Sequence, residues 1–164
     1  MTTLAYKDGI LAADGKATRG EMIVDLNTKK VRRLRDGSLV GITGTPAPAA
    51  PFIEWLEAGA EGASPSLGSN CCVVHLKPDS IRIYEDGGWM DEDPAKFYAW
   101  GSGWQIATTA MICGKTAEQA VKLAITLDIW SGGKVIAMPL NRKPITQRQA
   151  DKIVKDFHAR KHGY

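Results

Sequence analysis

The feature that most constrains the fold is a tight hairpin pattern at the amino-terminal end of the sequence. Two short apolar runs, Leu4–Tyr6 and Ile10–Ala13, flank the dipeptide Asp8-Gly9. An Asp-Gly pair suits the positive φ angles of a two-residue turn between antiparallel strands. The pattern therefore predicts strand, turn and strand from the first residues of the chain, and an ordered amino-terminal end.

Counting outward from this turn places two threonines beside an acid. Lys7 pairs with Ile10, so that Thr3 faces Asp14 and Thr2 lies diagonal to the same carboxylate. Methionine before a small residue is normally removed, so we expect Thr2 to become the first residue. Such a residue carries both a hydroxyl and a free α-amine that can take its proton. The α-amine titrates near pH ~7.7–8, which suits a general base at neutral pH.

A cation near that amine would lower its pKa by disfavouring the ammonium form, and an acid would hold the cation in place. Lys30 is the candidate cation and Asp14 the candidate acid. The plainer interpretations are that Thr2 is an ordinary strand residue and that Lys30 and Asp14 form an ion pair at the end of a sheet.

The order of the remaining predicted elements indicates an α+β fold. Further strands are predicted over 22–26, 30–34, 38–43, 71–76, 81–84, 96–100 and 134–138, and the first two of these are expected to pair with each other. Helices are predicted from Pro51, over 104–112, from the Thr116 and Gln119 capping box to Ile129, and after Thr146. Residues 59–70 read as a loop. Because strands and helices do not alternate, antiparallel sheets with segregated helices are expected.

Composition narrows the class of protein. The 164 residues suit one domain, residues 1–164, in which 147–164 form a terminal helix with a basic tail. No apolar run is long enough for a membrane span and no signal segment opens the chain, so a cytoplasmic protein is predicted. The three cysteines are expected to be buried, reduced thiols.

Other ligand classes have weak support. The net charge is +3, and the basic run Lys29–Arg33 lacks interleaved aromatics, so a solvated face is favoured over nucleic-acid binding. Gly114-Lys115-Thr116 lacks the earlier glycine of a phosphate-binding loop. His158 and His162 lie one helical turn apart without a third ligand nearby. No metal and no cofactor is predicted.

The run TTLAYKDGILAADGKAT, followed by TKKVRRL, resembles the proteasome β-subunits and, more closely, HslV. Both are N-terminal nucleophile (Ntn) hydrolases. The resemblance implies that Thr2 is the nucleophile and that Asp14 and Lys30 are its catalytic partners. Compared with HslV, the hairpin is shorter by about two residues on each arm, and symmetric shortening keeps the register.

Three later segments extend this resemblance. Gly41-Ile42-Thr43-Gly44 resembles the segment that forms the oxyanion hole, which implies that Gly44 stabilises the tetrahedral intermediate. Gly101-Ser102-Gly103 resembles a turn whose serine, here Ser102, hydrogen-bonds near the amine of the nucleophile. The run from Asp128 to Gly133 resembles a segment in which Asp128 and Ser131 position the terminus. The plainer interpretation of both serines is turn and cap residues.

The resemblance also implies a substrate site. Thr18 corresponds to a contact with the substrate strand, Ile42 to a pocket position, and Ala17 and Thr28 to further lining. Pro46 stands where a small residue is usual. Since proline has no N–H, one backbone hydrogen bond to substrate is expected to be lost, worth roughly 0.5–1.5 kcal/mol.

The implied fold is a four-layer αββα sandwich with one helical layer reduced, because 59–70 is too short for the second helix of a family pair. The implied function is a threonine peptidase acting on peptides or unfolded proteins, as a homo-oligomer served by an ATPase unfoldase. One alternative is a catalytically silent Ntn-fold assembly or scaffold protein. Another is a small-amide hydrolase on the same fold.

Overall fold

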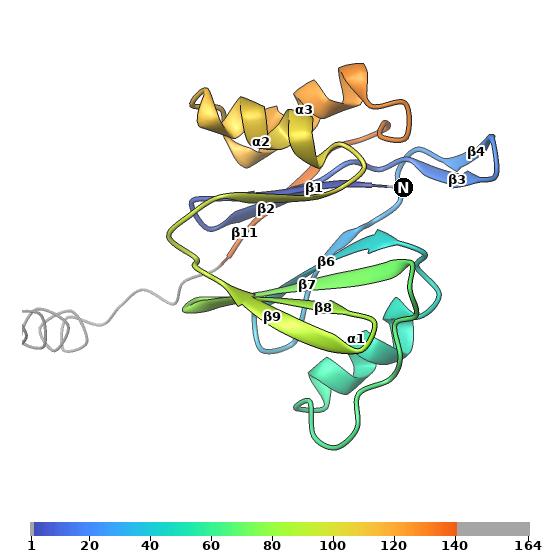
Figure 1. Cartoon of the computed structure of the whole chain (residues 1–164), viewed down its shortest axis with the longest axis vertical. Coiled ribbons are helices and arrows are strands. Elements are labelled where there is room, and N and C mark those ends of the chain that lie inside the picture. Colours follow the sequence, from blue (N-terminus) through green and yellow to red (C-terminus); the bar gives the residue numbers. More distant parts are fainter. Residues whose placement is uncertain (1, 141–164) are drawn as a thin grey trace, which may run out of the picture.

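A computed structural model describes residues 2–140, which build two stacked antiparallel sheets flanked by helices (Figure 1). One sheet has the order β10-β1-β2-β11 and the other β5-β6-β7-β8-β9, and β3 and β4 form a separate hairpin. The strands are β1 (Thr3–Lys7), β2 (Ile10–Ala13), β3 (Ala17–Arg19), β4 (Met22–Asp25), β5 (Val31–Arg33), β6 (Leu39–Gly44), β7 (Cys71–Lys77), β8 (Ser80–Glu85), β9 (Gly88–Glu92), β10 (Tyr98–Gly101) and β11 (Ile136–Pro139). The helices are α1 (Ala49–Glu57), α2 (Trp104–Ile112) and α3 (Ala117–Leu127).

The amino-terminal hairpin has the predicted register. Lys7 pairs with Ile10, and the Asp14 amide donates to the Thr3 carbonyl at 3.2 Å. Asp8 and Gly9 have φ angles of 53° and 76°, as the tight turn requires. Because β1 lies between β2 and β10, the start of the chain is held on both sides.

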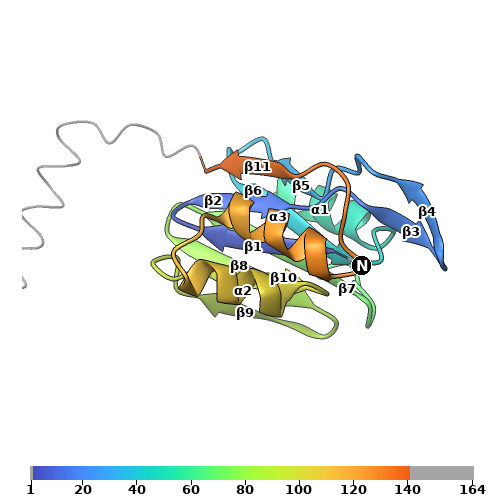
Figure 2. The same ribbon diagram turned by 90° about the horizontal axis from the view of Figure 1, so that it is seen from above.

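Alternation along β1 and β2 decides which layer each side chain joins. The large side chains face the second sheet, in a shared core that includes Leu4, Tyr6, Leu11, Val74, Leu76 and Ile81. Ala5 and Ala12 face the other way and pack against α2 and α3, which lie over this sheet (Figure 2). Replacing a buried leucine between the sheets by alanine is expected to cost about 2–5 kcal/mol.

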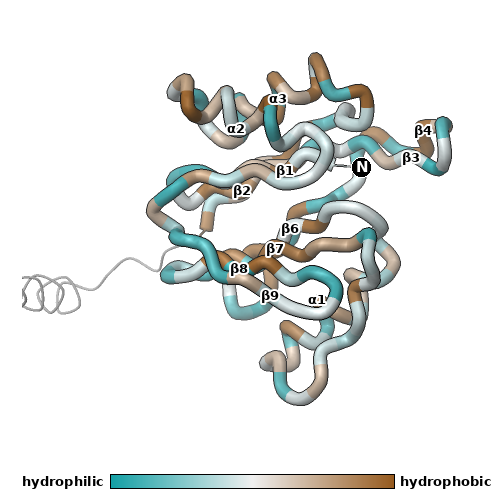
Figure 3. The backbone as a smooth tube through the Cα atoms, viewed as in Figure 1, coloured by the Kyte–Doolittle hydropathy of each residue, from teal (hydrophilic) through white to brown (hydrophobic). Residues whose placement is uncertain are grey.

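The outer face of the second sheet is covered by α1. This helix buries Phe52, Ile53 and Leu56 in a cluster with residues of β6, β7 and β8. Residues 59–70, which follow it, form neither helix nor strand. The predicted sandwich with one reduced helical layer is therefore confirmed within residues 2–140, and hydrophobic residues, brown in Figure 3, recur along the strands of both sheets.

Two strand predictions were wrong. Segments 22–26 and 30–34 do not pair with each other, because β4 folds back on β3 while β5 pairs with β6. Asp25 causes the separation: its carboxylate accepts the Asn27 amide at 3.0 Å and the Thr28 hydroxyl at 2.7 Å, which ends β4 in a turn. Strands β3 and β9 were missed, since β3 has only three residues and the exposed sequence of β9 has no apolar alternation.

Other predictions divide between confirmed and wrong. α2 has the predicted bounds, and α3 begins at the predicted Thr116–Gln119 capping box but ends at Leu127 rather than Ile129. Cys71 is buried, whereas Cys113 is exposed at the end of α2. The helix predicted after Thr146, and the pair His158 and His162, lie outside the described residues. Among residues 2–140, no helix combines the length and the apolar character needed to cross a membrane.

Candidate active site

A cavity of about 460 Å³ opens beside the amino-terminal end of the chain, between the β3–β4 hairpin, β5, β6 and α1. Three residues predicted to be catalytic line it: Thr2, Lys30 and Gly44. The predicted substrate-binding residues Ala17, Thr18, Thr28, Ile42 and Pro46 line the same cavity. Thr2 and Pro46 are 44 positions apart in the sequence, and the structure brings both to this cavity.

Asp14 lies at the end of β2 and connects three segments. One carboxylate oxygen accepts the Thr3 amide and the Lys30 ammonium, each at 2.9 Å. The other accepts the Gly132 amide at 3.0 Å and the Lys16 amide at 3.2 Å. Since Asp14 is only 1% exposed, these four bonds satisfy a buried carboxylate that would otherwise be costly. Asp14 therefore holds both the first strand and the candidate cation.

Lys30 is buried at the start of β5 and forms a salt bridge with Asp14. Burial lowers the pKa of Lys30 below its usual value, and the Asp14 carboxylate opposes this shift. The lysine is thus a positive charge in a poorly solvated position on the wall of the cavity. A positive charge there disfavours protonation of any amine close by.

Behind the first strand, Ser102, Asp128 and Ser131 form a hydrogen-bonded group. The hydroxyls of both serines donate to Asp128 Oδ2, each at 2.6 Å. Burial raises the pKa of Asp128, but these bonds and the Trp130 amide outweigh it and hold the pKa below its usual value. The group therefore contains a stable carboxylate.

This group contacts the backbone of Thr2 and the side chain of Thr3. The Ser102 amide donates to the Thr2 carbonyl at 2.7 Å. Thr3 Oγ1 lies 2.6 Å from Ser131 Oγ, and since the Ser131 hydroxyl donates to Asp128, the Thr3 hydroxyl is the donor. The resemblance had placed Ser102, Asp128 and Ser131 around the terminal amine. The contacts of the described residues instead run to the Thr2 carbonyl and the Thr3 side chain.

Gly101 is needed for this close approach. Its φ of +89° suits glycine, and a Cβ at this position would collide with the Thr2 carbonyl. The neighbouring Gly103 is equally confined, because a Cβ there would overlap Thr3 Oγ1. The Gly-Ser-Gly sequence thus allows the turn after β10 to lie directly against the terminal strand.

The two threonines have different surroundings. Thr2 lines the cavity, whereas Thr3 is fully buried and its hydroxyl is engaged by Ser131. Successive side chains of a strand point to opposite faces. The geometry therefore makes Thr2 the better candidate for a nucleophile that meets a substrate.

Gly44 ends β6 at the exposed rim of the cavity. It has a φ of +79°, and a Cβ would collide with the Asn70 carbonyl. That carbonyl accepts the Thr45 amide at 2.7 Å, which fixes the turn after Gly44. A glycine is therefore required at the position where the resemblance implies an oxyanion donor.

Four basic residues of the cavity were missed as site residues. Lys16, Arg19, Lys29 and Arg32 line it together with Lys30, and its lining contains no Asp or Glu. The run Lys29–Arg33 had been assigned to a solvated face. Burial does not alternate along this run, because Lys30 and Val31 are buried while Lys29, Arg32 and Arg33 are exposed, so strand periodicity offered no signal for the lining. In the described chain, no group of three or more His, Cys, Asp and Glu could hold a metal ion.

Comparisons with known proteins agree with this geometry. Residues 2–77 match the family model described as proteasome subunit. The HslV ATP-dependent protease subunit of Treponema denticola is 26% identical, over 79% of this chain and 90% of that protein. The chain is thus similar in sequence to proteasome subunits and to HslV. Caulobacter vibrioides HslV is 40% identical to this HslV-like chain, over 38% of the chain and 34% of HslV.

Solved structures support the same fold. The eukaryotic HslV of Trypanosoma brucei has a TM-score of 0.65 at 17% identity, covering 84% of this chain and 97% of that one. The Thiobacillus denitrificans BPH in complex with epoxomicin has a TM-score of 0.59 at 23% identity, covering 86% and 99%. The four-layer Ntn fold of this HslV-like chain is therefore shared with relatives that have diverged widely in sequence.

Proposed function

We propose that this HslV-like chain is an N-terminal threonine peptidase in which Thr2, exposed by removal of Met1, attacks the peptide bond. The observation that carries the proposal is the single cavity lined by Thr2, Lys30, Gly44 and the predicted substrate-binding residues. Thr3, the other hydroxyl nearby, is held by Ser131 behind the strand.

In the proposed reaction, Thr2 Oγ bonds to the carbonyl carbon and its proton passes to the Thr2 α-amine. The Gly44 amide stabilises the negative carbonyl oxygen of the tetrahedral intermediate. The amine then protonates the leaving nitrogen, and an ester to Thr2 remains. Water, deprotonated by the same amine, hydrolyses this ester and restores the hydroxyl. Lys30, held in place by Asp14, keeps the amine neutral, while Ser102, Asp128 and Ser131 hold the strand that carries it.

The lining of the cavity supports a substrate class. Lys16, Arg19, Lys29 and Arg32 form no salt bridge within residues 2–140, and only Lys30 is compensated, by Asp14. Ile42, Val24 and other apolar residues complete the lining. We propose that peptides with acidic side chains beside the cleaved bond are the preferred substrates, because they neutralise this excess charge.

The relatives also support an assembly. HslV proteins are named ATP-dependent protease subunits, which supports a homo-oligomer and an ATPase unfoldase as partners for this chain. We further propose one domain over residues 1–164 and a cytoplasmic location. The roles proposed for Thr2, Asp14 and Lys30 do not depend on how neighbouring copies are arranged, because all three residues come from one chain.

A scaffold without catalysis is the second candidate, favoured by Pro46 at the rim of the cavity and by the reduced helical layer. Intact mass separates the two candidates, since the peptidase requires a chain lacking Met1. Fully processed, assembled protein that stays inactive on unfolded proteins and on panels of short peptides would favour the scaffold.

The decisive experiment compares Thr2→Ala with Thr2→Ser and Thr3→Ala, all in processed chains. Thr2→Ala should abolish peptide hydrolysis without unfolding the protein, while Thr2→Ser keeps a nucleophile and retains measurable activity. Thr3→Ala should reduce but not abolish hydrolysis, because it removes only the contact with Ser131. Circular dichroism checks the fold. Unchanged hydrolysis by the Thr2→Ala protein would contradict the mechanism.

A further inference from the structure

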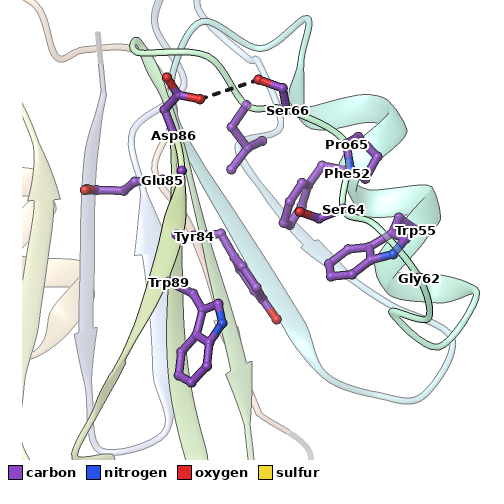
Figure 4. A pocket seen from close by; sticks show the side chains of 13 residues that line it. Phe52, Trp55, Gly62, Ser64, Pro65, Ser66, Tyr84, Glu85, Asp86 and Trp89 are labelled. Atoms are coloured by element: carbon purple, nitrogen blue, oxygen red, sulfur yellow. Dashed lines mark hydrogen bonds between the residues drawn. The ribbon is translucent and has the colours of Figure 1, made fainter.

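A second cavity, of about 620 Å³, lies between the loop after α1 and the turn that joins β8 to β9. It shares no lining residue with the candidate active site. It occupies the place where residues 59–70 leave the outer layer without a second helix. Figure 4 shows Phe52 and Trp55 on α1 facing Tyr84 and Trp89 from β8 and β9 across this space.

The aromatic rings form a connected group. The Phe52 and Tyr84 ring centres are 4.9 Å apart, and the Trp55 centre lies 5.1 Å from Phe52 and 6.2 Å from Tyr84. Trp89 adds a ring that is 59% exposed. Phe52 and Tyr84 are buried, so Trp89 supplies most of the exposed aromatic surface. An exposed ring beside a cavity is typical of a binding site rather than of a closed core.

The charge at this cavity is negative. Asp86 lines it, no Lys or Arg does, and the Asp86 carboxylate has no salt bridge among the described residues. Glu85 also borders the cavity, but Figure 4 shows its side chain pointing away from the aromatic rings. Asp86 accepts only a long hydrogen bond, 3.5 Å, from Ser66. Aromatic faces and nearby carboxylates together favour an organic cation.

The same aromatic surface already holds a guanidinium group. The Arg82 Cζ lies 3.9 Å from the centre of the Trp89 ring. The charge of Arg82 is compensated by Asp91, which accepts two hydrogen bonds at 2.6 and 2.9 Å. Asp86 therefore remains available for a cation from outside.

The neighbouring backbone favours a polypeptide as the source of that cation. β9 is an edge strand of its sheet, and β8 is its strand partner in the described chain. Gly88 and Trp89, at the start of β9, line the cavity. An extended segment that pairs with the edge could place a side chain into the cavity.

We propose that this cavity binds a basic segment of another polypeptide, with an arginine or lysine side chain against Trp55, Tyr84 and Trp89 and its charge near Asp86. The segment pairs with the edge of β9. This site does not require the proposed peptidase activity, so either proposal can fail alone.

Calorimetry with an end-blocked seven-residue peptide of valine and threonine around one central arginine tests the proposal. The Thr2→Ala protein is used so that the probe is not cleaved. Replacing the arginine by citrulline, which has a similar shape but no charge, should weaken binding about tenfold. The variants Asp86→Asn and Trp89→Ala should each cause a comparable loss, whereas Glu85→Gln should not.

Trp104→Ala is the matched control, because Trp104 is an exposed tryptophan on α2, and it should leave binding unchanged. Equal affinity for the arginine and citrulline peptides, an unchanged affinity in Trp89→Ala, or no binding of the arginine peptide would overturn the proposal. Arginine amide that binds as tightly as the peptide would overturn the pairing with β9.

Discussion

The two cavities of this molecule use the same sheet but have opposite charge. The candidate active site is lined by five Lys and Arg residues and no acid, whereas the aromatic cavity is lined by two acids and no Lys or Arg. The first forms where chain segments cross between the sheets, and the second where the outer layer is thin. The comparison teaches that one sheet can border two cavities that favour ligands of opposite charge.

The largest expected effect concerns the buried cation of the active site. Lys30→Ala should remove most hydrolysis near neutral pH, because loss of the charge raises the pKa of the Thr2 amine. Two charges about 4 Å apart interact by roughly 4 kcal/mol at an effective dielectric near 20, and a third of that is about one pKa unit. The acidic limb of the pH–rate profile should therefore move to higher pH.

Lys29→Ala is the matched control for this change, since Lys29 lines the same cavity but is exposed. The acidic limb of the pH–rate profile of Lys29→Ala should stay close to that of the unmodified chain. Superimposable profiles for Lys30→Ala and the unmodified chain would refute the role of Lys30. Binding of the arginine peptide to the aromatic cavity should be the same in both variants.

A second prediction sharpens the contrast in charge. The double variant Lys29→Glu, Arg32→Glu should lower kcat/KM for an acidic peptide relative to its amide counterpart by about tenfold, since both side chains reach the cavity. Raising the salt concentration should weaken the preference of the unmodified chain. Lys96→Glu, outside both cavities, serves as control. A preference for basic peptides in the unmodified chain would contradict the proposed substrate class.

A last prediction separates the stability of the second sheet from catalysis. His75 is buried on β7, 2.9 Å from Ser38 Oγ, and burial lowers its pKa to about 4. An unfolded histidine titrates near 6.5, so the unfolded state binds more protons between these values, and stability falls as the pH drops from about 6.5 to about 4. The loss is on the order of 3 kcal/mol.

His75→Gln keeps a hydrogen-bonding side chain that does not titrate, so its free energy of unfolding should fall less over this pH range. Urea denaturation at several pH values measures the difference. A parallel fall in both proteins would show that other groups cause the acid sensitivity. The substrate preference at neutral pH should be unchanged by this substitution.

Local patterns predicted much of this molecule. Asp8-Gly9 sets the register of the first hairpin, and the capping residues Thr116 and Gln119 set the start of α3. The positions of Asp14 and Lys30 followed from that register and from the family resemblance. These features depend on interactions within a few residues along the chain, which is why they can be predicted.

The failures involve contacts between distant segments. β4 pairs with β3 rather than with the following strand, because Asp25 ends it in a turn. The basic lining of the active-site cavity was missed because the sequence around β5 does not show that the β3–β4 hairpin lines the same cavity. The contact of Thr3 with Ser131 joins residues 128 positions apart, and no local pattern indicates it.

The sequence by itself determined the hairpin at the amino terminus, most of the strands and helices, and the residue types that the proposed chemistry needs. Those follow from turn chemistry, alternation and capping, which act over short distances. Only the tertiary structure decided which threonine lines a cavity, how Asp14 joins Thr3, Lys30 and Gly132, and why two cavities of opposite charge exist. The physical reason is that burial, charge balance and enclosed space arise when segments far apart in the sequence pack together.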